Sequence, residues 1–242
     1  MKIGLSYTGS PIKHQHYVDW LAQEGDADIF TLDPEKDNAS ELRTCDGLVL
    51  AGGIDVNPKL YNGNSDYANK PEKWNEKRDA FETELYLIAK ELRMPVLAIC
   101  RGMHLVNVLE GGTLRPDLGK LNITHYKTAD GDSQHRVEVL LGSQLRKILE
   151  IEAGEINSAH HQCVDTLGEG LIGNCLASDE TIEGIEWENT QERGFFIGVQ
   201  WHPERMVLLG LGESRMATAI RERFVEEVSV HESKSKQNQH AY

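Results

Sequence analysis

The sequence predicts an α/β fold: a central, mostly parallel sheet flanked by helices, with added antiparallel strands. In the first half, short apolar runs such as DGLVLA (46–51) and PVLAIC (95–100) alternate with amphipathic stretches. That order is typical of a parallel sheet with helices on its faces. In the second half, several strand-like runs follow one another with few helices between them, which indicates antiparallel strands appended to that sheet.

The elements of the first half follow from periodicity. Phe81, Leu85, Ile88 and Leu92 recur at helical spacing and so share one helical face. The Gly111-Gly112 pair is a plausible helix stop. We therefore expect strands at 2–7, 46–51 and 95–100 and helices at 14–24, 79–93 and 103–111.

The second half and the end of the chain differ in character. We expect a final helix at 213–228, because Met216, Ile220, Phe224 and Val228 form one apolar stripe. Residues 1–228 are then one domain, and the polar residues 229–242 are expected to form a disordered tail. The aperiodic polar stretch 57–75 is typical of a functional surface loop. Strands are expected at 136–141, 171–177, 182–188 and 195–201.

Charge and cysteine content exclude several classes of partner. The 242-residue chain has 25 Lys and Arg against 39 Asp and Glu, a formal net charge of -14. Such a surface repels nucleic acid and anionic membranes, so we expect neither as a partner. No apolar run is long enough to span a bilayer and no signal-peptide pattern is present, so we expect a cytoplasmic protein. The four cysteines show no CxxC spacing, which favours reduced thiols over a structural zinc site.

The stretch PVLAICRGMHL places Cys100 between a buried strand and a helix. A nucleophile in such a strand-turn-helix elbow is lifted clear of the backbone, and the nearby Gly102 relieves crowding. The helix N-terminus favours a thiolate, and its N–H groups can stabilise an oxyanion. A cysteine at the end of an apolar strand is, however, more often a packed small hydrophobe, so this stretch alone leaves both roles open.

Two further segments supply what a cysteine nucleophile requires. His202 and Glu204 stand two residues apart in VQWHPE, and on a strand-like segment such residues point to the same side. His202 is thus a candidate base and Glu204 the group that orients it. The Gly52-Gly53 pair after the strand at 46–51 allows the close backbone approach that a second oxyanion-hole donor needs.

These segments together resemble the class I glutamine amidotransferase-like family, which has a flavodoxin-like fold, and within it the γ-glutamyl hydrolase branch that includes γ-glutamyl-γ-aminobutyrate hydrolases. The resemblance spans residues 1 to about 225, with the pieces in the family's order. Its matching pieces are GGIDVNP (52–58), KRDAFETEL (77–85), PVLAICRGMHLVNVLEGGTL (95–114), INSAHHQ (156–162) and GVQWHPE (198–204).

The resemblance implies hydrolysis of a γ-glutamyl amide bond through a thioester on Cys100, releasing glutamate and an amine. His202 would act as general base and then acid, with Glu204 holding its imidazole. The backbone N–H groups of Gly53 and Arg101 would form the oxyanion hole. By the same resemblance, the substrate pocket would include His104, His160 and Gln162.

Other polar residues receive lesser roles. We expect Arg78, Asp79 and Glu82 to brace the helix and the adjoining loop. No metal or organic cofactor is implied by the resemblance. The remaining histidines show no ligand spacing and suggest no metal site: His14, His16, His125 and His135.

The sequence departs from the family pattern at two positions. Ala98 stands where members usually carry glycine, which is a small change within a strand. His104 replaces the glutamine of the common CRGxQ pattern, which is associated with recognition of the glutamyl group. An imidazole cannot reproduce an amide's paired donor and acceptor, so the identity of the substrate stays open at His104.

Three functions therefore compete. The first is a stand-alone hydrolase of a small γ-glutamyl compound, which the branch resemblance favours. The second is a glutaminase subunit that supplies ammonia to a separate synthase partner. The third is a catalytically silent binding or regulatory homologue. A homodimer is compatible with all three, and one sequence does not decide it.

Overall fold

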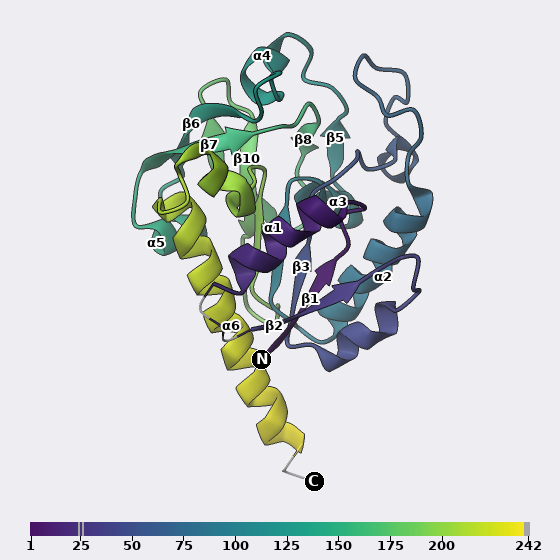
Figure 1. The fold of residues 1–242 in the computed structure, drawn as a ribbon, viewed down its shortest axis with the longest axis vertical. Helices are drawn as coiled ribbons and strands as arrows, with labels where there is room; N and C mark the ends of the chain where they lie inside the picture. The colour runs from purple at the N-terminus through teal and green to yellow at the C-terminus, as the bar shows by residue number, and fades with distance from the viewer. Residues whose placement is uncertain (24, 26, 240–242) are drawn as a thin grey trace.

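The computed structural model describes residues 1–23, 25 and 27–239. Its core is a nine-stranded sheet in the order β2-β1-β3-β4-β11-β10-β9-β6-β7 (Figure 1). The first five strands in this order pair in parallel. They are β2 (Asp28–Leu32), β1 (Lys2–Ser6), β3 (Gly47–Leu50), β4 (Val96–Ile99) and β11 (Phe196–Val199).

The other four strands extend the sheet with antiparallel pairing. They are β10 (Ile182–Trp187), β9 (Leu171–Ala177), β6 (Ser133–Val139) and β7 (Ala153–Ser158). A small second sheet pairs β5 (Thr113–Arg115) with β8 (Cys163–Thr166). The predicted architecture, a mostly parallel sheet with added antiparallel strands, is confirmed.

Helices cover both faces of the sheet, as expected for strands that are buried throughout. One apolar cluster joins a face of the sheet to α1 (Pro11–Leu21), α5 (Gln144–Leu149) and α6 (Arg215–Gln239). A second cluster joins the opposite face to the 3₁₀ helix η1 (Ala39–Thr44), α2 (Glu76–Glu91) and α3 (Arg101–Leu109). The short helices are η2 (Pro58–Tyr61), η3 (Gly119–Leu121), α4 (Asn122–His125) and η4 (Pro203–Leu209).

The first helix begins earlier than predicted. Ser10 accepts a hydrogen bond from the N–H of Lys13, and Pro11 occupies the first helical turn, so the helix starts at Pro11 rather than at 14. It ends at Leu21; residue 24, the predicted last residue, lies outside the described residues. The sequence analysis missed β2 and β7, which are partly exposed and lack a continuous apolar run.

The tail expected to be disordered from residue 229 is helical as far as Gln239. The buried Val228 anchors α6 on the sheet, so the helix needs no new nucleus beyond it. His231 donates from Nε2 to the carbonyl of Leu92 at 3.2 Å, and Lys236 pairs with Glu232 one turn away at 2.7 Å. The polar composition of the segment after Val228 therefore led to the wrong expectation of disorder for residues 229–239. Residues 240–242 lie outside the described residues.

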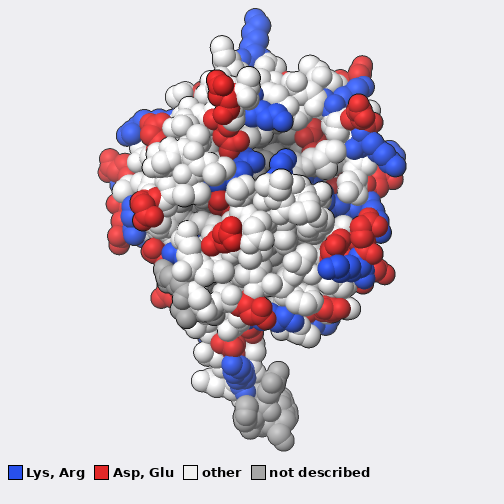
Figure 2. Space-filling view, in the orientation of Figure 1, with Lys and Arg blue, Asp and Glu red and all other residues white. Residues whose placement is uncertain are grey.

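The surface carries charges of both signs. Figure 2 shows Lys and Arg interspersed with Asp and Glu over the face drawn, without a broad patch of one sign. Among the described helices, none is both long enough and apolar enough to cross a membrane.

Replacing Phe224 tests the packing of α6. This side chain is fully buried between α6 and the sheet, so Phe224→Ala should lower the free energy of unfolding by about 3–5 kcal/mol. Urea unfolding followed by circular dichroism measures the loss. Val230→Ala, at a position 42% exposed on the same helix, should change it by less than about 0.5 kcal/mol. Equal effects of the two variants would contradict this packing.

Candidate active site

Cys100 occupies a strained turn between β4 and α3. Its backbone has φ 51° and ψ -108°, in the region that L residues rarely adopt. A Cβ on Gly102 would lie 2.3 Å from the carbonyl oxygen of Leu50, so only glycine fits where the turn presses on β3. The predicted strand-turn-helix geometry is therefore present at Cys100, and strain of this kind typically clusters at functional sites.

His202 and Glu204 meet directly after β11. Nδ1 of His202 donates to Oε1 of Glu204 at 2.8 Å, which fixes the tautomer and turns Nε2 outward from the pair. The backbone N–H of His202 donates to Oδ1 of Asn157 at 3.0 Å. Both side chains are buried, and Glu204 lies in the first turn of η4 rather than on a strand. The predicted contact therefore forms, although the segment turns at Pro203.

The electrostatics of this pair favour a protonated imidazole. Burial and the nearby Arg205 guanidinium lower the pKa of His202, but the Glu204 carboxylate and the Cys100 sulfur outweigh them. The pKa of His202 is raised to about 9. At neutral pH the ring therefore carries a proton, and it lies beside the sulfur that the sequence predicts as nucleophile.

The three other cysteines are poor candidates for a nucleophile. Burial raises the pKa of the Cys45 thiol to about 11 and that of Cys163 to about 12. Burial also raises the pKa of Cys175 well above its ordinary value. All four cysteines are free, as predicted, and these three serve as packing residues.

The Gly52-Gly53 turn lies against the triad. A Cβ on Gly52 would lie 2.6 Å from Cε1 of His202, so the ring occupies the space that a side chain would need. The Gly52 N–H donates to the Tyr17 hydroxyl at 2.9 Å, and that hydroxyl lies 3.5 Å from Nδ1 of His202. A Cβ on Gly53 would lie 2.2 Å from Nη1 of Arg78. Glycine at both positions thus permits close approach, as predicted.

A buried chain of ion pairs joins this turn to the elbow. Arg101 donates to the carboxylates of Asp79 and Glu82, and Glu82 accepts from Nε of Arg78 at 2.8 Å. Nη2 of Arg78 donates to the carbonyls of Ala51 and Gly52, each at 3.0 Å. Arg78, Asp79 and Glu82 therefore brace α2 and the glycine turn, the role expected from the sequence.

One pocket of about 690 Å³ brings the predicted residues together. Its lining includes charged groups of both signs, among them Lys13, Lys127, Asp55 and Asp132. A pocket of this size suits a small molecule. Every residue that the sequence analysis assigned to the site lines it: Cys100, His202, Glu204, Gly53, Arg101, His104, His160 and Gln162.

His104 is buried beside the pocket with one ring nitrogen already engaged. Its Nε2 lies 2.6 Å from Oε1 of Gln200, and because an amide oxygen only accepts, Nε2 carries the hydrogen. Burial lowers the pKa of His104 to about 4, so the ring is neutral at physiological pH. Any contact that His104 makes with a substrate is therefore that of a neutral imidazole.

His160 and Gln162 are held by the protein itself. Gln162 accepts from the N–H of Val56 at 3.3 Å and donates to the Tyr61 hydroxyl at 3.2 Å. His160 donates from Nδ1 to the carbonyl of Gln162 at 3.1 Å, and its Nε2 faces Glu183 at 3.4 Å. Both line the pocket, but their side chains connect segments of its wall.

The loop at 57–75 is hydrogen-bonded to segments beside the pocket. The Tyr67 hydroxyl donates to Asp55, which also lies 3.1 Å from Nε2 of His161. Asn69 donates through its side chain to Asp117 at 2.7 Å. These contacts connect the loop to the segments that carry the site.

The sequence analysis missed several residues around the site. Tyr17 lies on a helix and Asn157 at the end of an unpredicted strand, and neither has local spacing that could have revealed its contact with His202. His125 and His135, which we expected to have no ligand role, lie with His160 around Glu183. Elements far apart in the sequence build this cluster, so no motif indicated it.

Comparisons with known proteins agree with the geometry. The Peptidase C26 family profile matches residues 12–204. Protein NtpR of Enterococcus hirae is 35% identical over 73% of this chain and 74% of its own length. Gamma-glutamyl-gamma-aminobutyrate hydrolase PuuD of Escherichia coli strain K12 is 30% identical over 67% and 65%, respectively.

A solved structure confirms the fold. The glutaminase domain of Trypanosoma brucei CTPS, with bound acivicin, superposes with a TM-score of 0.66 at 13% identity. The match covers 95% of this chain and 94% of that one, so the chain has the glutamine amidotransferase fold.

The raised pKa of His202 can be tested by titration. In the wild-type protein the ring should keep its proton above pH 7 and lose it near pH 9, because Glu204 and the Cys100 sulfur favour the charged form. Glu204→Gln removes the carboxylate charge and should lower the midpoint. NMR of ¹³C-labelled histidine measures both. Glu138→Gln, on the exposed side of β6, is the matched control; a midpoint that does not move in Glu204→Gln would contradict the pairing.

Proposed function

Because the chain belongs to the Peptidase C26 family of glutamine amidotransferase-like hydrolases, we propose that it hydrolyses the γ-glutamyl amide bond of a small γ-glutamyl compound. The products are glutamate and an amine. The observation that carries this proposal is the placement of Cys100, His202 and Glu204 on one pocket, with His202 hydrogen-bonded to Glu204.

The first half-reaction forms a thioester. The sulfur of Cys100 attacks the γ-carbonyl carbon, and the carbonyl electron pair moves to oxygen. His202 is protonated at neutral pH, and its proton passes to the amide nitrogen as the carbon–nitrogen bond breaks. The amine leaves, and the glutamyl group stays on the sulfur.

The second half-reaction hydrolyses the thioester and regenerates the free enzyme. The neutral His202 now accepts a proton from water, whose oxygen attacks the thioester carbon. The carbon–sulfur bond breaks, glutamate leaves, and the sulfur and imidazolium are restored. Glu204 stabilises the charged ring through the 2.8 Å hydrogen bond and transfers no proton itself.

The oxygen that gains charge in both steps needs hydrogen-bond donors. Within the proposal these are the backbone N–H groups of Gly53 and Arg101, which belong to residues on the same pocket as Cys100. Arg101 starts α3, so the helix dipole adds a favourable field at the oxyanion. The buried ion pairs of Arg78 and Arg101 with Glu82 support both donors by holding their turns.

The pocket supports a small zwitterionic substrate. Lys13 and Lys127 line it together with Asp55 and Asp132, which suits the carboxylate and ammonium groups of a glutamyl moiety. The Escherichia coli relative is named as a γ-glutamyl-γ-aminobutyrate hydrolase, which supports a γ-glutamyl amine rather than free glutamine as the substrate. His104, as a neutral ring where the family pattern has glutamine, would select among such substrates.

The first prediction from this proposal concerns substrate class. The purified chain alone should release glutamate from γ-glutamyl amines faster than from glutamine. Cys100→Ala should reduce kcat/KM by at least about 10³-fold, because no other group attacks the carbonyl. Cys163→Ala, at a buried thiol outside the pocket, is the control and should retain turnover.

The other outcomes identify the competing functions. Activity on glutamine that requires a partner would indicate a glutaminase subunit that feeds a separate synthase. No turnover of either substrate class, with the Cys100 thiol resistant to alkylation, would indicate a silent binding homologue and would overturn the proposed hydrolysis.

A second prediction separates the roles of the two other triad members. His202→Ala should abolish turnover, whereas Glu204→Gln should retain measurable residual activity, because Glu204 orients the ring without moving protons. Steady-state kinetics with the best γ-glutamyl amine give both values, with Glu138→Gln as control. Equal and complete loss in both variants would contradict this division.

A further inference from the structure

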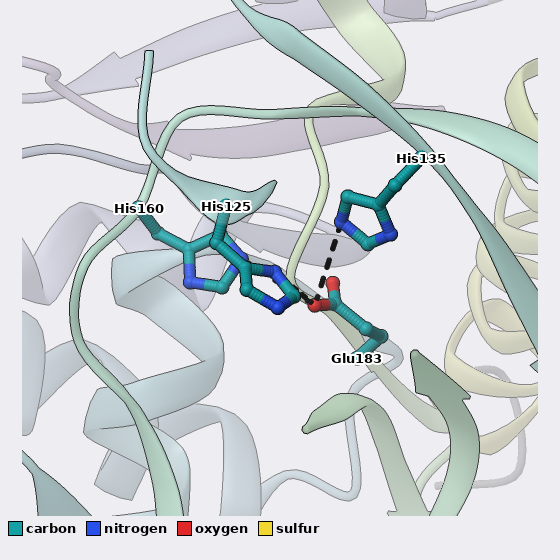
Figure 3. Close-up of side chains that lie close together, drawn as sticks. All are labelled: His125, His135, His160 and Glu183. Atoms are coloured by element: carbon teal, nitrogen blue, oxygen red, sulfur yellow. Dashed lines mark ion pairs between the residues drawn. The ribbon is translucent and has the colours of Figure 1, made fainter. Parts of the chain in front are cut away.

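Three histidines and one glutamate from four separate elements converge behind the wall of the active-site pocket. His125 ends α4, His135 lies on β6, His160 follows β7, and Glu183 lies on β10 (Figure 3). One ligand atom from each of the four lies within 4.8 Å of all the others. The group, called here the His₃Glu cluster, is therefore compact enough to surround a single ion.

Distances inside the His₃Glu cluster match those around a tetrahedral ion. Oε1 of Glu183 lies 3.1 Å from Nδ1 of His125, 3.4 Å from Nε2 of His160 and 3.8 Å from Nε2 of His135. Ligand atoms at about 2.0–2.1 Å from a tetrahedral zinc ion lie roughly 3.3 Å from one another. Small side-chain adjustments would bring all four atoms to that spacing.

The facing atoms of the cluster lack hydrogen bonds. His125 and Glu183 are fully buried, and His160 is 4% exposed. Yet Nδ1 of His125, Nε2 of His135 and His160, and both oxygens of Glu183 have no hydrogen-bond partner among the described residues. Buried polar atoms are normally paired, because leaving them unpaired costs free energy. Within the described part of the chain, these atoms contact one another only through the ion pairs of the three rings with a single oxygen of Glu183, and a cation among them would give all of these atoms a common partner.

The ring nitrogens that point away from the cluster indicate the tautomer of each histidine. Nε2 of His125 donates to Asp179 at 2.9 Å, and Nδ1 of His160 donates to the carbonyl of Gln162 at 3.1 Å. Nδ1 of His135 lies 3.3 Å from the carbonyl of Arg136. Oxygens of these kinds only accept, so whenever a ring is in its neutral form the other nitrogen presents its lone pair to the cluster. Metal-binding histidines are typically oriented by such carboxylates and carbonyls.

We propose that the His₃Glu cluster is a structural zinc site. Three imidazole nitrogens and a carboxylate suit Zn²⁺, whereas Mg²⁺ and Ca²⁺ prefer oxygen ligands throughout. Four protein ligands, of which His125, His160 and Glu183 are buried and His135 is partly buried, leave no open position for a reacting water, which is the pattern of a structural site. The sequence analysis expected no metal here, because ligands spread from residue 125 to residue 183 produce no short spacing motif.

The position of the proposed zinc site indicates which part of the protein the ion would stabilise. His160 belongs to the segment 159–162, and the next residues, His161 and Gln162, line the pocket. His161 contacts Asp55 and Asp117, and Gln162 contacts Val56. A zinc ion on His160 would fix this wall relative to β6 and β10. The site is separate from the Cys100 chemistry, so its test does not depend on the proposed hydrolysis.

Metal content gives the direct test. The Cys100→Ala variant is used, so that zinc cannot bind between the Cys100 sulfur and His202. Purified from zinc-supplemented cells without chelator, it should contain about one zinc ion per chain by plasma mass spectrometry. X-ray absorption at the zinc edge should show nitrogen and oxygen ligands and no sulfur. Protein that stays zinc-free in the presence of excess zinc, or a spectrum with sulfur, would overturn the proposal.

Graded variants locate the metal. In competition with a chromophoric chelator, Glu183→Gln should weaken zinc binding by more than about 100-fold, and Asp179→Asn, which alters only the group behind His125, by about 10–100-fold. His16→Ala, outside the cluster, should leave the affinity unchanged. Unchanged affinity in Asp179→Asn would contradict the site, and this conservative variant decides the matter if Glu183→Gln does not fold.

Thermal stability tests the structural role. Zinc at a hundred times its Kd should raise Tm by about 5–10 °C relative to chelator-treated protein, because the ion binds only the folded chain. Asp179→Asn should need more zinc for the same shift. A Tm that does not respond to zinc would contradict a structural site.

Discussion

The chain of buried ion pairs from Arg101 through Glu82 to Arg78 is the interaction on which the site depends. Charges taken out of water are costly unless they are paired and hydrogen-bonded, and removing one partner leaves the other uncompensated. Here the pairs connect the turn after β4, the helix α2 and the carbonyls of Ala51 and Gly52 after β3. These ion pairs thereby hold the elbow of Cys100 and the glycine turn at the carboxyl ends of the parallel strands. His202 lies at the same end of the sheet, shortly after β11.

Much of the parallel half of the fold could be predicted from the sequence, because each of its central strands is a continuous apolar run. In the antiparallel half, the strand β9 likewise coincides with the predicted residues 171–177. The contact between His202 and Glu204 was predicted from their spacing, and the turn at Cys100 from the strand-turn-helix pattern. Both succeeded because the determining information is local.

Interactions between distant segments could not be predicted in this way. The helix at 229–239 depends on an anchor at Val228 and on contacts with the body of the protein, whereas its composition alone suggests disorder. His125 and His135 carry no motif. The pairing of β6 with β9 and of β9 with β10 brings His135 near Glu183, and α4, which carries His125, packs against β6. Residue type and spacing therefore indicated the chemistry at Cys100 but not the cluster behind it.

The pocket and the His₃Glu cluster share one wall. Gln162 and His161 face the pocket, while His160, beside them, also faces Glu183. The antiparallel extension of the sheet thus supports one side of the pocket, and the parallel half carries Cys100, His202 and the glycine turn. Substrate selection would then depend on how firmly this wall is held against His104.

The central claim, that Cys100 forms a covalent acyl intermediate, is tested most directly by trapping it. Glu204→Gln protein mixed with a γ-glutamyl amine and quenched rapidly in acid should gain the mass of one γ-glutamyl group. Peptide mapping should place that group on Cys100 and on none of Cys45, Cys163 and Cys175, because Cys100 alone among the four cysteines lines the pocket. A label on another cysteine, or substrate turnover in the Cys100→Ala variant, would contradict the account.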